Sequence, residues 1–175
     1  LFDVLDALEF EKHSNKITVS VTTNGTLLKK SVREEYLSRI PHSITVFSID
    51  AATPETFKKI RIFDCFDKVL ENLYAFANER IQNRQFLKIN CNVNILNVKE
   101  IVGLVDIAHK ANVNCFEINP TDGFNQKLLV NKENCGLFRK AQLDIIERCE
   151  KLGVKYDFPK PLDLGMTENL IQITL

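Results

Sequence analysis

ITVFSIDAATPETFKKIR, residues 44–61, is the stretch that decides the fold. Its first half alternates as a strand does, and the polar residues Ser48 and Asp50 share one face near its end. A helix signal follows at once, because Thr53 is a good N-cap and Pro54 suits the first helical position. We therefore expect Ser48 and Asp50 at the carboxyl end of a strand, beside a helix N-terminus. Ligands bind at that place in α/β folds.

The composition of the 175 residues fits one globular domain with a real core, since 45% of them are hydrophobic. Lysine plus arginine number 23, as do aspartate plus glutamate, and no block of like charge stands out. Neither nucleic acid nor a membrane surface is therefore an expected partner. No apolar run is long enough to span a membrane, and no signal-peptide pattern is present.

The five cysteines are scattered through the sequence. The nearest consecutive pair, Cys135 and Cys149, are fourteen residues apart. An odd number without paired spacing argues against a disulfide framework and favours a reducing, cytoplasmic location. The chain opens LFDVLDALEF, already in helical register and without an initiator methionine, so we expect it to be cut from a longer protein.

Strand and helix patterns alternate along the chain, which predicts a parallel sheet with right-handed crossovers. Ser31 with Glu34 and Asn97 with Glu100 resemble capping boxes, and Asp64 resembles a single cap. Strands are expected over residues 16–23, 44–50, 87–95, 113–119 and 154–157. Helices are expected over residues 1–10, 31–40, 54–61, 65–77, 98–111 and 134–152.

The distribution of polar and apolar residues over the two faces of the strands distinguishes two parallel architectures. A doubly wound sheet is covered on both faces, so its strands are almost wholly apolar. Here one face of residues 87–95 is apolar and the other is polar, namely Lys88, Asn90, Asn92 and Asn94. We therefore predict an α/β fold with outer helices and a polar lumen. Four or five strands are too few for an eight-stranded barrel, so the barrel is expected to be partial and open.

Most of these polar groups also have a structural interpretation that needs no ligand. The block TTNG, residues 22–25, could be only a turn. Ser48 and Asp50 could cap a helix, and Arg61 could be a solvated charge. Glu117 could satisfy neighbouring backbone. The polar line from Lys88 onward is harder to dismiss, because it needs water or a ligand; an edge strand facing solvent is its alternative.

Four blocks together resemble the radical S-adenosylmethionine (SAM) enzymes. They are TTNGTLL, SIDAATPETFKKIR, FDKVLENL, and LKINCNVNILNVKEIVGLVDIAHKANV followed by FEINP. The similarity covers residues 1–117 and is strongest to the branch with the molybdenum-cofactor cyclase and the peptide-modifying enzymes with auxiliary clusters. It implies a partial (β/α)6 barrel, TIM-like, over residues 1–158. That barrel would lack its first strand or two, and residues 159–175 would form a tail or the start of a further segment.

The resemblance also implies chemistry. A four-iron four-sulfur cluster in a CxxxCxxC loop binds SAM, an electron donor reduces it, and the resulting 5′-deoxyadenosyl radical abstracts hydrogen from a small-molecule or peptide substrate. Ser48 matches the strand-end serine near SAM, and Arg61 an arginine that can pair with its carboxylate. Thr23 and Asn24 match a block that lines the site, and Lys88 matches a lysine that faces the substrate.

Strand parity adds further candidates for the lumen. We expect one concave surface near the strand ends, lined by Ser48, Asp50, Asn92, Asn94 and Glu117.

The sequence departs from the family pattern at three places. CxxxCxxC and the GGEP block are absent, which is expected if both precede residue 1, and Ala51 and Ala52 stand where many peptide-modifying members have glycine. No catalytic residue or metal ligand is therefore assigned, and the chain alone is expected to be inactive. Two alternatives stay open: a ligand- or partner-binding barrel that lost its cluster, or an unrelated partial-barrel lyase.

Overall fold

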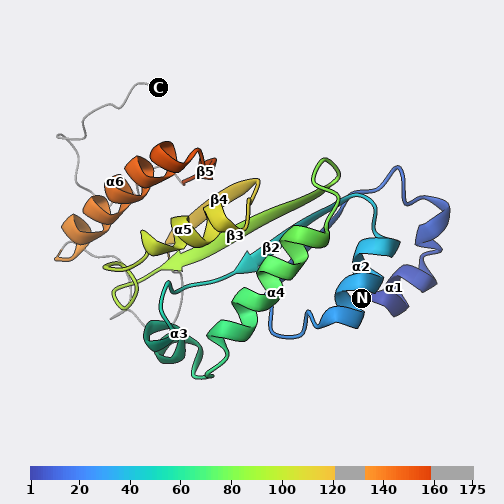
Figure 1. Ribbon diagram of the computed structural model, residues 1–175, viewed down its shortest axis with the longest axis horizontal. Coiled ribbons are helices and arrows are strands. Elements are labelled where there is room, and N and C mark those ends of the chain that lie inside the picture. Colours follow the sequence, from blue (N-terminus) through green and yellow to red (C-terminus); the bar gives the residue numbers. More distant parts are fainter. Residues whose placement is uncertain (121–132, 159–175) are drawn as a thin grey trace.

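The computed structural model describes residues 1–120 and 133–158 (Figure 1). The described strands form one parallel sheet in sequence order: β1 (Val19–Thr23), β2 (Ser43–Ser48), β3 (Gln85–Val93), β4 (Cys115–Pro120) and β5 (Tyr156–Asp157). The helices are α1 (Phe2–Ala7), the 3-10 turn η1 (Phe10–Lys12), α2 (Lys30–Arg39), α3 (Pro54–Arg61), α4 (Phe66–Glu79), α5 (Gly103–Lys110) and α6 (Cys135–Leu152). The expected tail, residues 159–175, lies outside this description.

Helices cover one face of the sheet, as the alternating strands predict. In Figure 1, α4 and α5 lie in front of the strands. Phe47 of β2 packs edge-on against Phe76 of α4, with ring centroids 5.8 Å apart. Ile89 and Phe116, which follow Phe47 across the sheet in register, are also fully buried. The α/β fold with parallel strands and outer helices is therefore confirmed.

The opposite face carries the polar side chains, and we call it the lumen face. Strand register sets Ser48 of β2 beside Asn90 of β3, Asn90 beside Glu117 of β4, and Glu117 beside Asp157 of β5. A second row, further from the strand ends, places Lys88 beside Cys115. Polar groups that are up to 109 positions apart in the sequence thus lie in one row across the sheet, from Ser48 to Asp157.

Three of the predicted helix caps are wrong, and one is right. Thr53 caps α3, since its Oγ1 accepts a hydrogen bond from the Thr56 amide at 3.4 Å. Ser31, by contrast, lies inside α2, which begins at Lys30 without a side-chain cap. Asp64 pairs with Lys58 at 3.1 Å, and α4 begins only at Phe66. Asn97 and Glu100 do not cap α5, which begins at Gly103 and has no side-chain cap bond.

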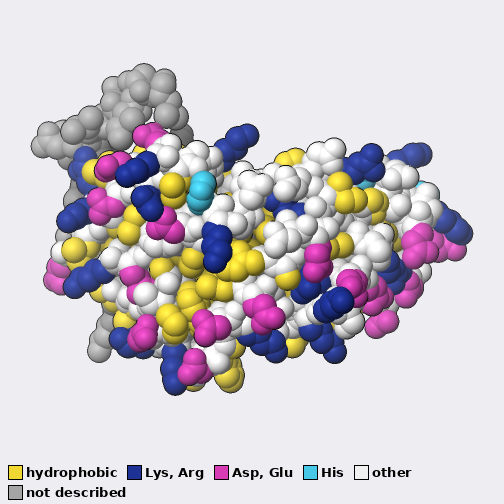
Figure 2. Space-filling model, viewed as in Figure 1, with side chains coloured by type: hydrophobic (Ala, Val, Ile, Leu, Met, Phe, Trp, Pro, Cys, Tyr) yellow, Lys and Arg dark blue, Asp and Glu magenta, His cyan; other side chains and the backbone are white. Residues whose placement is uncertain are grey.

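The surface of the helix-covered side is mixed in charge. Figure 2 shows lysine and arginine interspersed with aspartate and glutamate over this face, as the balanced composition predicts. Among the described residues, no helix has both the length and the apolar character needed to cross a membrane.

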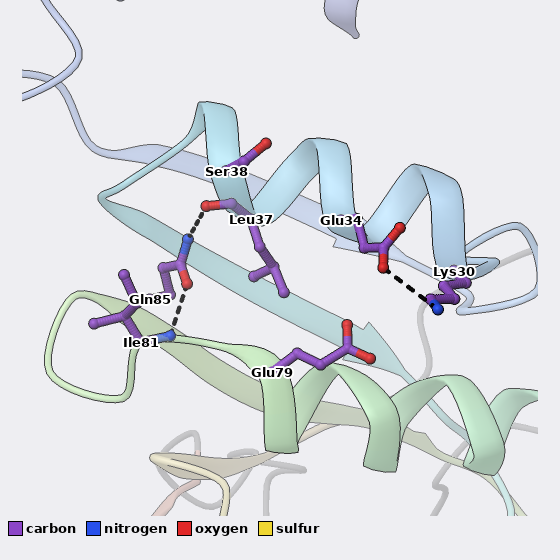
Figure 3. A pocket seen from close by; sticks show the side chains of 7 residues that line it. All are labelled: Lys30, Glu34, Leu37, Ser38, Glu79, Ile81 and Gln85. Carbon is purple, nitrogen blue, oxygen red and sulfur yellow. Dashed lines mark hydrogen bonds and ion pairs between the residues drawn. The ribbon is translucent and has the colours of Figure 1, made fainter.

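A shallow groove of about 560 Å³ separates α2 from the end of α4 (Figure 3). The Gln85 side chain closes its floor: the amide Nε2 donates to the carbonyls of Leu37 and Ile40, each at 2.8 Å, and Oε1 accepts from the Ile81 amide at 2.8 Å. Because Gln85 begins β3, this groove lies at the amino ends of the strands. It is therefore at the opposite edge of the sheet from the candidate ligand groups.

An ion pair joins α2 to α4 at the rim of this groove. Arg33 donates from Nε and Nη2 to the two oxygens of Glu79, at 2.7 and 2.8 Å, and the arginine side chain is 7% exposed. The hydrogen bonds from Arg33 hold the pKa of Glu79 below its ordinary value. The pair therefore contributes stability above the ordinary glutamate pKa, and this contribution is lost as the pH falls through the lowered folded-state pKa.

We expect Glu79→Gln to lower the free energy of unfolding at pH 7 by about 1–2 kcal/mol, a modest figure because the carboxylate is 38% exposed. Urea unfolding of both proteins between pH 7 and pH 3 measures it, and the difference should shrink towards the acid end. Glu147→Gln, at an exposed position on α6, is the control. A difference between Glu79→Gln and the parent that is independent of pH would contradict the ionic account.

Candidate functional site

Three side chains meet at the carboxyl end of β2. The Asp50 carboxylate is buried, and its Oδ2 pairs with Nη2 of Arg61 at 2.6 Å. The same Nη2 donates to Ser48 Oγ at 2.9 Å and to the Ser48 carbonyl at 3.3 Å. Asp50 Oδ1 accepts from the Asn92 amide at 2.9 Å, which ties β2 to β3. The structure thus brings Ser48, Asp50 and Arg61 together at the end of β2.

Two buried atoms at this cluster have no hydrogen-bond partner among residues 1–120 and 133–158: Nε of Arg61 and Oδ1 of Asn90. Asn90 lies next to Ser48 in strand register. A buried polar atom without a partner costs about 1–3 kcal/mol, so such atoms usually mark a missing water, ion or ligand. The cluster therefore offers one donor and one acceptor to a bound molecule.

The N-terminus of α3 is not available to a ligand, contrary to our expectation, because Glu100 fills it. Glu100 Oε1 accepts from the amides of Ala52 and Thr53 at 2.9 and 3.2 Å. Its Oε2 accepts from the hydroxyls of Thr53 and Thr56 at 2.7 and 2.9 Å. Arg61, the last residue of α3, is therefore our candidate for the cationic group at the carboxyl end of β2.

Lys88 and Glu117 form an ion pair on the lumen face, between β3 and β4. The hydrogen bond to Glu117 raises the pKa of Lys88 above its ordinary value. Cys115 is the neighbour of Lys88 in register, and burial, together with the charge of Glu117, raises the pKa of its thiol. Glu117 therefore lies on the expected face, but it pairs with Lys88, and no hydrogen bond or ion pair joins it to Arg61 within the described part of the chain.

Asn94 has the contacts of a turn residue, and its expected place in the lumen stays a prediction. The strand ends at Val93, so the alternation that placed Asn94 beside Asn92 no longer holds there. Asn94 is buried, and its Oδ1 accepts from the Leu96 amide at 2.9 Å, which closes a turn. Asn92 lies on the lumen face with Lys88 and Asn90, because the residues that alternate with them, Leu87, Ile89 and Cys91, face the helices.

Thr23 and Asn24 have turn contacts, as their structural interpretation requires. Thr23 Oγ1 accepts from the Gly25 amide at 3.0 Å, and Asn24 Oδ1 accepts from the Thr26 amide at 3.1 Å. Thr23 is also paired in register with Phe47, which faces the helices, so its side chain is on the side away from the lumen. A ligand contact by Thr23 is therefore not supported by the fold, and one by Asn24 stays a prediction.

Sequence reasoning missed Asn90 and Glu100 as members of the site. Asn90 stood in the polar line of β3, and its register with Ser48 is the signal that singles it out. Glu100 was part of the predicted capping box with Asn97, but its hydrogen bonds are to the start of α3 rather than to its own helix.

The thiols of the chain do not form a metal site in the described residues. No group of three or more histidine, cysteine, aspartate or glutamate side chains there could hold a metal ion. None of the five cysteines is in a disulfide. Cys91 and Cys149 are buried in the core. The described residues therefore offer no set of ligands that fits a four-iron cluster.

No protein-family model matches the chain. Two curated relatives are each named probable GTP 3',8-cyclase, one from Saccharolobus islandicus and one from Saccharolobus solfataricus, and each is 28% identical. The matches cover 90% and 87% of this chain but 48% and 46% of the relatives. The chain thus spans about half the length of these curated relatives.

Two solved structures share the fold. Streptococcus suis SuiB bound to S-adenosylmethionine has a TM-score of 0.64 and 17% identity, over 88% of this chain and 34% of that one. The protein anSMEcpe with bound AdoMet and a peptide has a TM-score of 0.64 and 16% identity, over 90% of this chain and 45% of that one. The ordered sequence blocks, the curated relatives and the shared fold establish that this chain is related to the radical SAM superfamily.

Proposed function

We propose that this chain is the SAM-binding part of the barrel of a radical SAM enzyme. The observation that carries the proposal is the Ser48–Asp50–Arg61 cluster at the end of β2, with the unpartnered Arg61 Nε beside it. The superfamily relation supplies the ligand, since SuiB and anSMEcpe are solved with SAM bound. A reduced four-iron cluster would supply the one electron that cleaves the sulfonium of SAM into methionine and a 5′-deoxyadenosyl radical, and that radical would abstract hydrogen from the substrate.

The side chains of Ser48, Asp50 and Arg61, together with Asn90, would suit the amino-acid end of SAM. Arg61 Nε would donate to the carboxylate, and Asp50 would keep the guanidinium in place through Nη2. Asn90 Oδ1, an acceptor, would take a hydrogen from the ammonium group. The site thus offers a donor to the anionic group and an acceptor to the cationic one.

The four-iron cluster would be held by cysteines from outside residues 1–175, because this sequence has no closely spaced set of cysteines. The ion pair of Lys88 and Glu117 would face the substrate, deeper on the lumen face. That substrate would be a small molecule or a peptide; SuiB and anSMEcpe are also solved with peptides. We also propose that an electron donor would reduce the four-iron cluster and that the enzyme is cytoplasmic.

Arg61→Ala tests the proposal in the holoenzyme with its cluster intact. We expect the free energy of SAM binding to weaken by about 1.5–3 kcal/mol, the cost of losing a charge-assisted hydrogen bond. Equilibrium dialysis with labelled SAM would measure the change. Lys59→Ala removes an exposed positive charge from the same helix and is the control. If Arg61→Ala binds SAM as tightly as Lys59→Ala, Arg61 is a structural charge and the site assignment is wrong.

A further inference from the structure

The turn between β3 and α5 holds the loop between β2 and α3. Asn97 is fully buried, and its Nδ2 donates to the Asp50 carbonyl at 2.8 Å and to the Asn92 carbonyl at 2.9 Å. Glu100 binds the next residues of the same loop. We call Asn97, Glu100 and Gly103 the clasp.

Glu100 is the charged member of the clasp and makes four hydrogen bonds to the start of α3. Two come from backbone amides, of Ala52 and Thr53. Two come from hydroxyls, of Thr53 and Thr56. The carboxylate is also placed where the helix dipole favours negative charge. A residue that is 44 to 48 positions away in the sequence thus anchors the N-terminus of α3.

Gly103 completes the clasp by close packing. A Cβ added at Gly103 would lie 3.0 Å from the Cβ of Ala52, which is tighter than ordinary van der Waals contact. The absence of a side chain lets the start of α5 approach the loop. All three members of the clasp therefore contact the segment between Asp50 and Thr56.

The other end of α3 is held to the sheet through Arg61, which pairs with Asp50 and donates to Ser48. The helix has eight residues, and within it only Thr56 and Phe57, near its start, are buried. Ile62, its C-cap residue, is 82% exposed and adopts a left-handed conformation with φ of 68°. Arg61 lies at this end, about 10 Å along the axis from Pro54. A tilt of about 10° at the N-terminus would therefore move Arg61 by roughly 2 Å, enough to break a hydrogen bond.

We propose that Glu100 is a positioning residue for SAM binding, which acts by fixing α3 and so the guanidinium of Arg61. This inference rests on the proposed function, because it assumes that Arg61 contacts SAM. Glu100 itself binds only the loop and the start of α3, and it makes no contact with Arg61 in the part of the chain that the structure describes.

A double-mutant cycle in the holoenzyme tests the proposal, with SAM affinity as the readout. Glu100→Ala should weaken SAM binding about tenfold in the parent and less than about twofold in the Arg61→Ala background, because both changes remove one interaction. Thr56→Val, which removes a single hydroxyl from Glu100, should give a smaller loss and guards against a folding defect. Glu55→Ala, an exposed acidic residue in the first turn of α3, is the control for charge and should leave the affinity unchanged.

Hydrogen exchange supplies a readout that does not depend on SAM. Glu100→Ala should speed exchange of the amides of α3 by about tenfold or more, whereas Glu55→Ala should not. If Arg61→Ala weakens SAM binding while Glu100→Ala does not, the positioning role is overturned and the proposed function stands. Equal losses from Glu100→Ala in both backgrounds also overturn it, since Glu100 would then act independently of Arg61. If Arg61→Ala has no effect, the proposed function fails first and the positioning role fails with it.

Discussion

Replacing Asn97 with alanine is expected to lower the free energy of unfolding by about 2–4 kcal/mol. The Asn97 side chain is 0% exposed and uses both ends of its amide. Oδ1 accepts from the Asn94 amide at 2.8 Å, and Nδ2 donates to the carbonyls of Asp50 and Asn92 at 2.8 and 2.9 Å. Alanine would leave one donor and two acceptors buried without partners. This cost exceeds the value of the bonds themselves.

Urea unfolding followed by circular dichroism would measure this loss. Asn78→Ala is the matched control, since Asn78 is an exposed asparagine of α4 for which we expect a change within about 0.5 kcal/mol. A loss below about 1 kcal/mol at Asn97 would show that water replaces the amide in the cavity. The loop would then be held mainly by Glu100.

The strand faces could be predicted from the sequence because strand alternation is local. Neighbouring side chains of a strand point to opposite sides, so the apolar face of β3 identifies the helix side. Leu87, Ile89 and Cys91 are fully buried, as expected. The same local rule placed Ser48 and Asp50 at the end of β2, and the cluster with Arg61 confirms that placement. The rule stops at the last strand residue, so it does not extend to Asn94, which follows the end of β3.

The partners of Asn97 and Glu100 could not be predicted in the same way. Their spacing fits a capping box, and nothing in the local sequence distinguishes a residue that caps its own helix from one that caps another. The true partners are on a loop between two other elements, and they become neighbours only when β3 pairs with β2. Sequence patterns report which groups need hydrogen bonds, whereas the register of distant strands decides which groups supply them.

The alternative of a barrel that lost its cluster makes a different prediction about the site. In a module without SAM chemistry Arg61 would be only a structural partner of Asp50 and Ser48, and Arg61→Ala would leave SAM binding unchanged. Arg61 pairs with Asp50 and Ser48 and still has an unpartnered Nε. On the proposed function, this Nε would donate to the carboxylate of SAM.

Residues 1–175, produced alone, are expected to bind far fewer than four iron atoms per chain after treatment with iron and sulfide. A four-iron cluster of this type needs three thiolates close together. Cys91 is buried on the helix side of β3, and burial raises the pKa of its thiol well above the ordinary value. Burial also raises the pKa of Cys149 to about 12. Loss of the thiol proton, which iron binding requires, is therefore less favourable at both cysteines than at an ordinary thiol.

The remaining cysteines do not supply the missing ligands. Cys65 precedes α4, Cys135 begins α6, and Cys115 lies at the start of β4 on the face of Lys88. No set of three or more metal-binding side chains forms among the described residues. We therefore expect no 5′-deoxyadenosine from SAM and dithionite. An iron assay and chromatography would measure both quantities, with Cys115→Ser as the control for adventitious iron and SuiB, treated identically, as the positive control. Four iron atoms per chain, with SAM cleavage that Cys115→Ser abolishes, would show that these scattered cysteines do assemble a cluster.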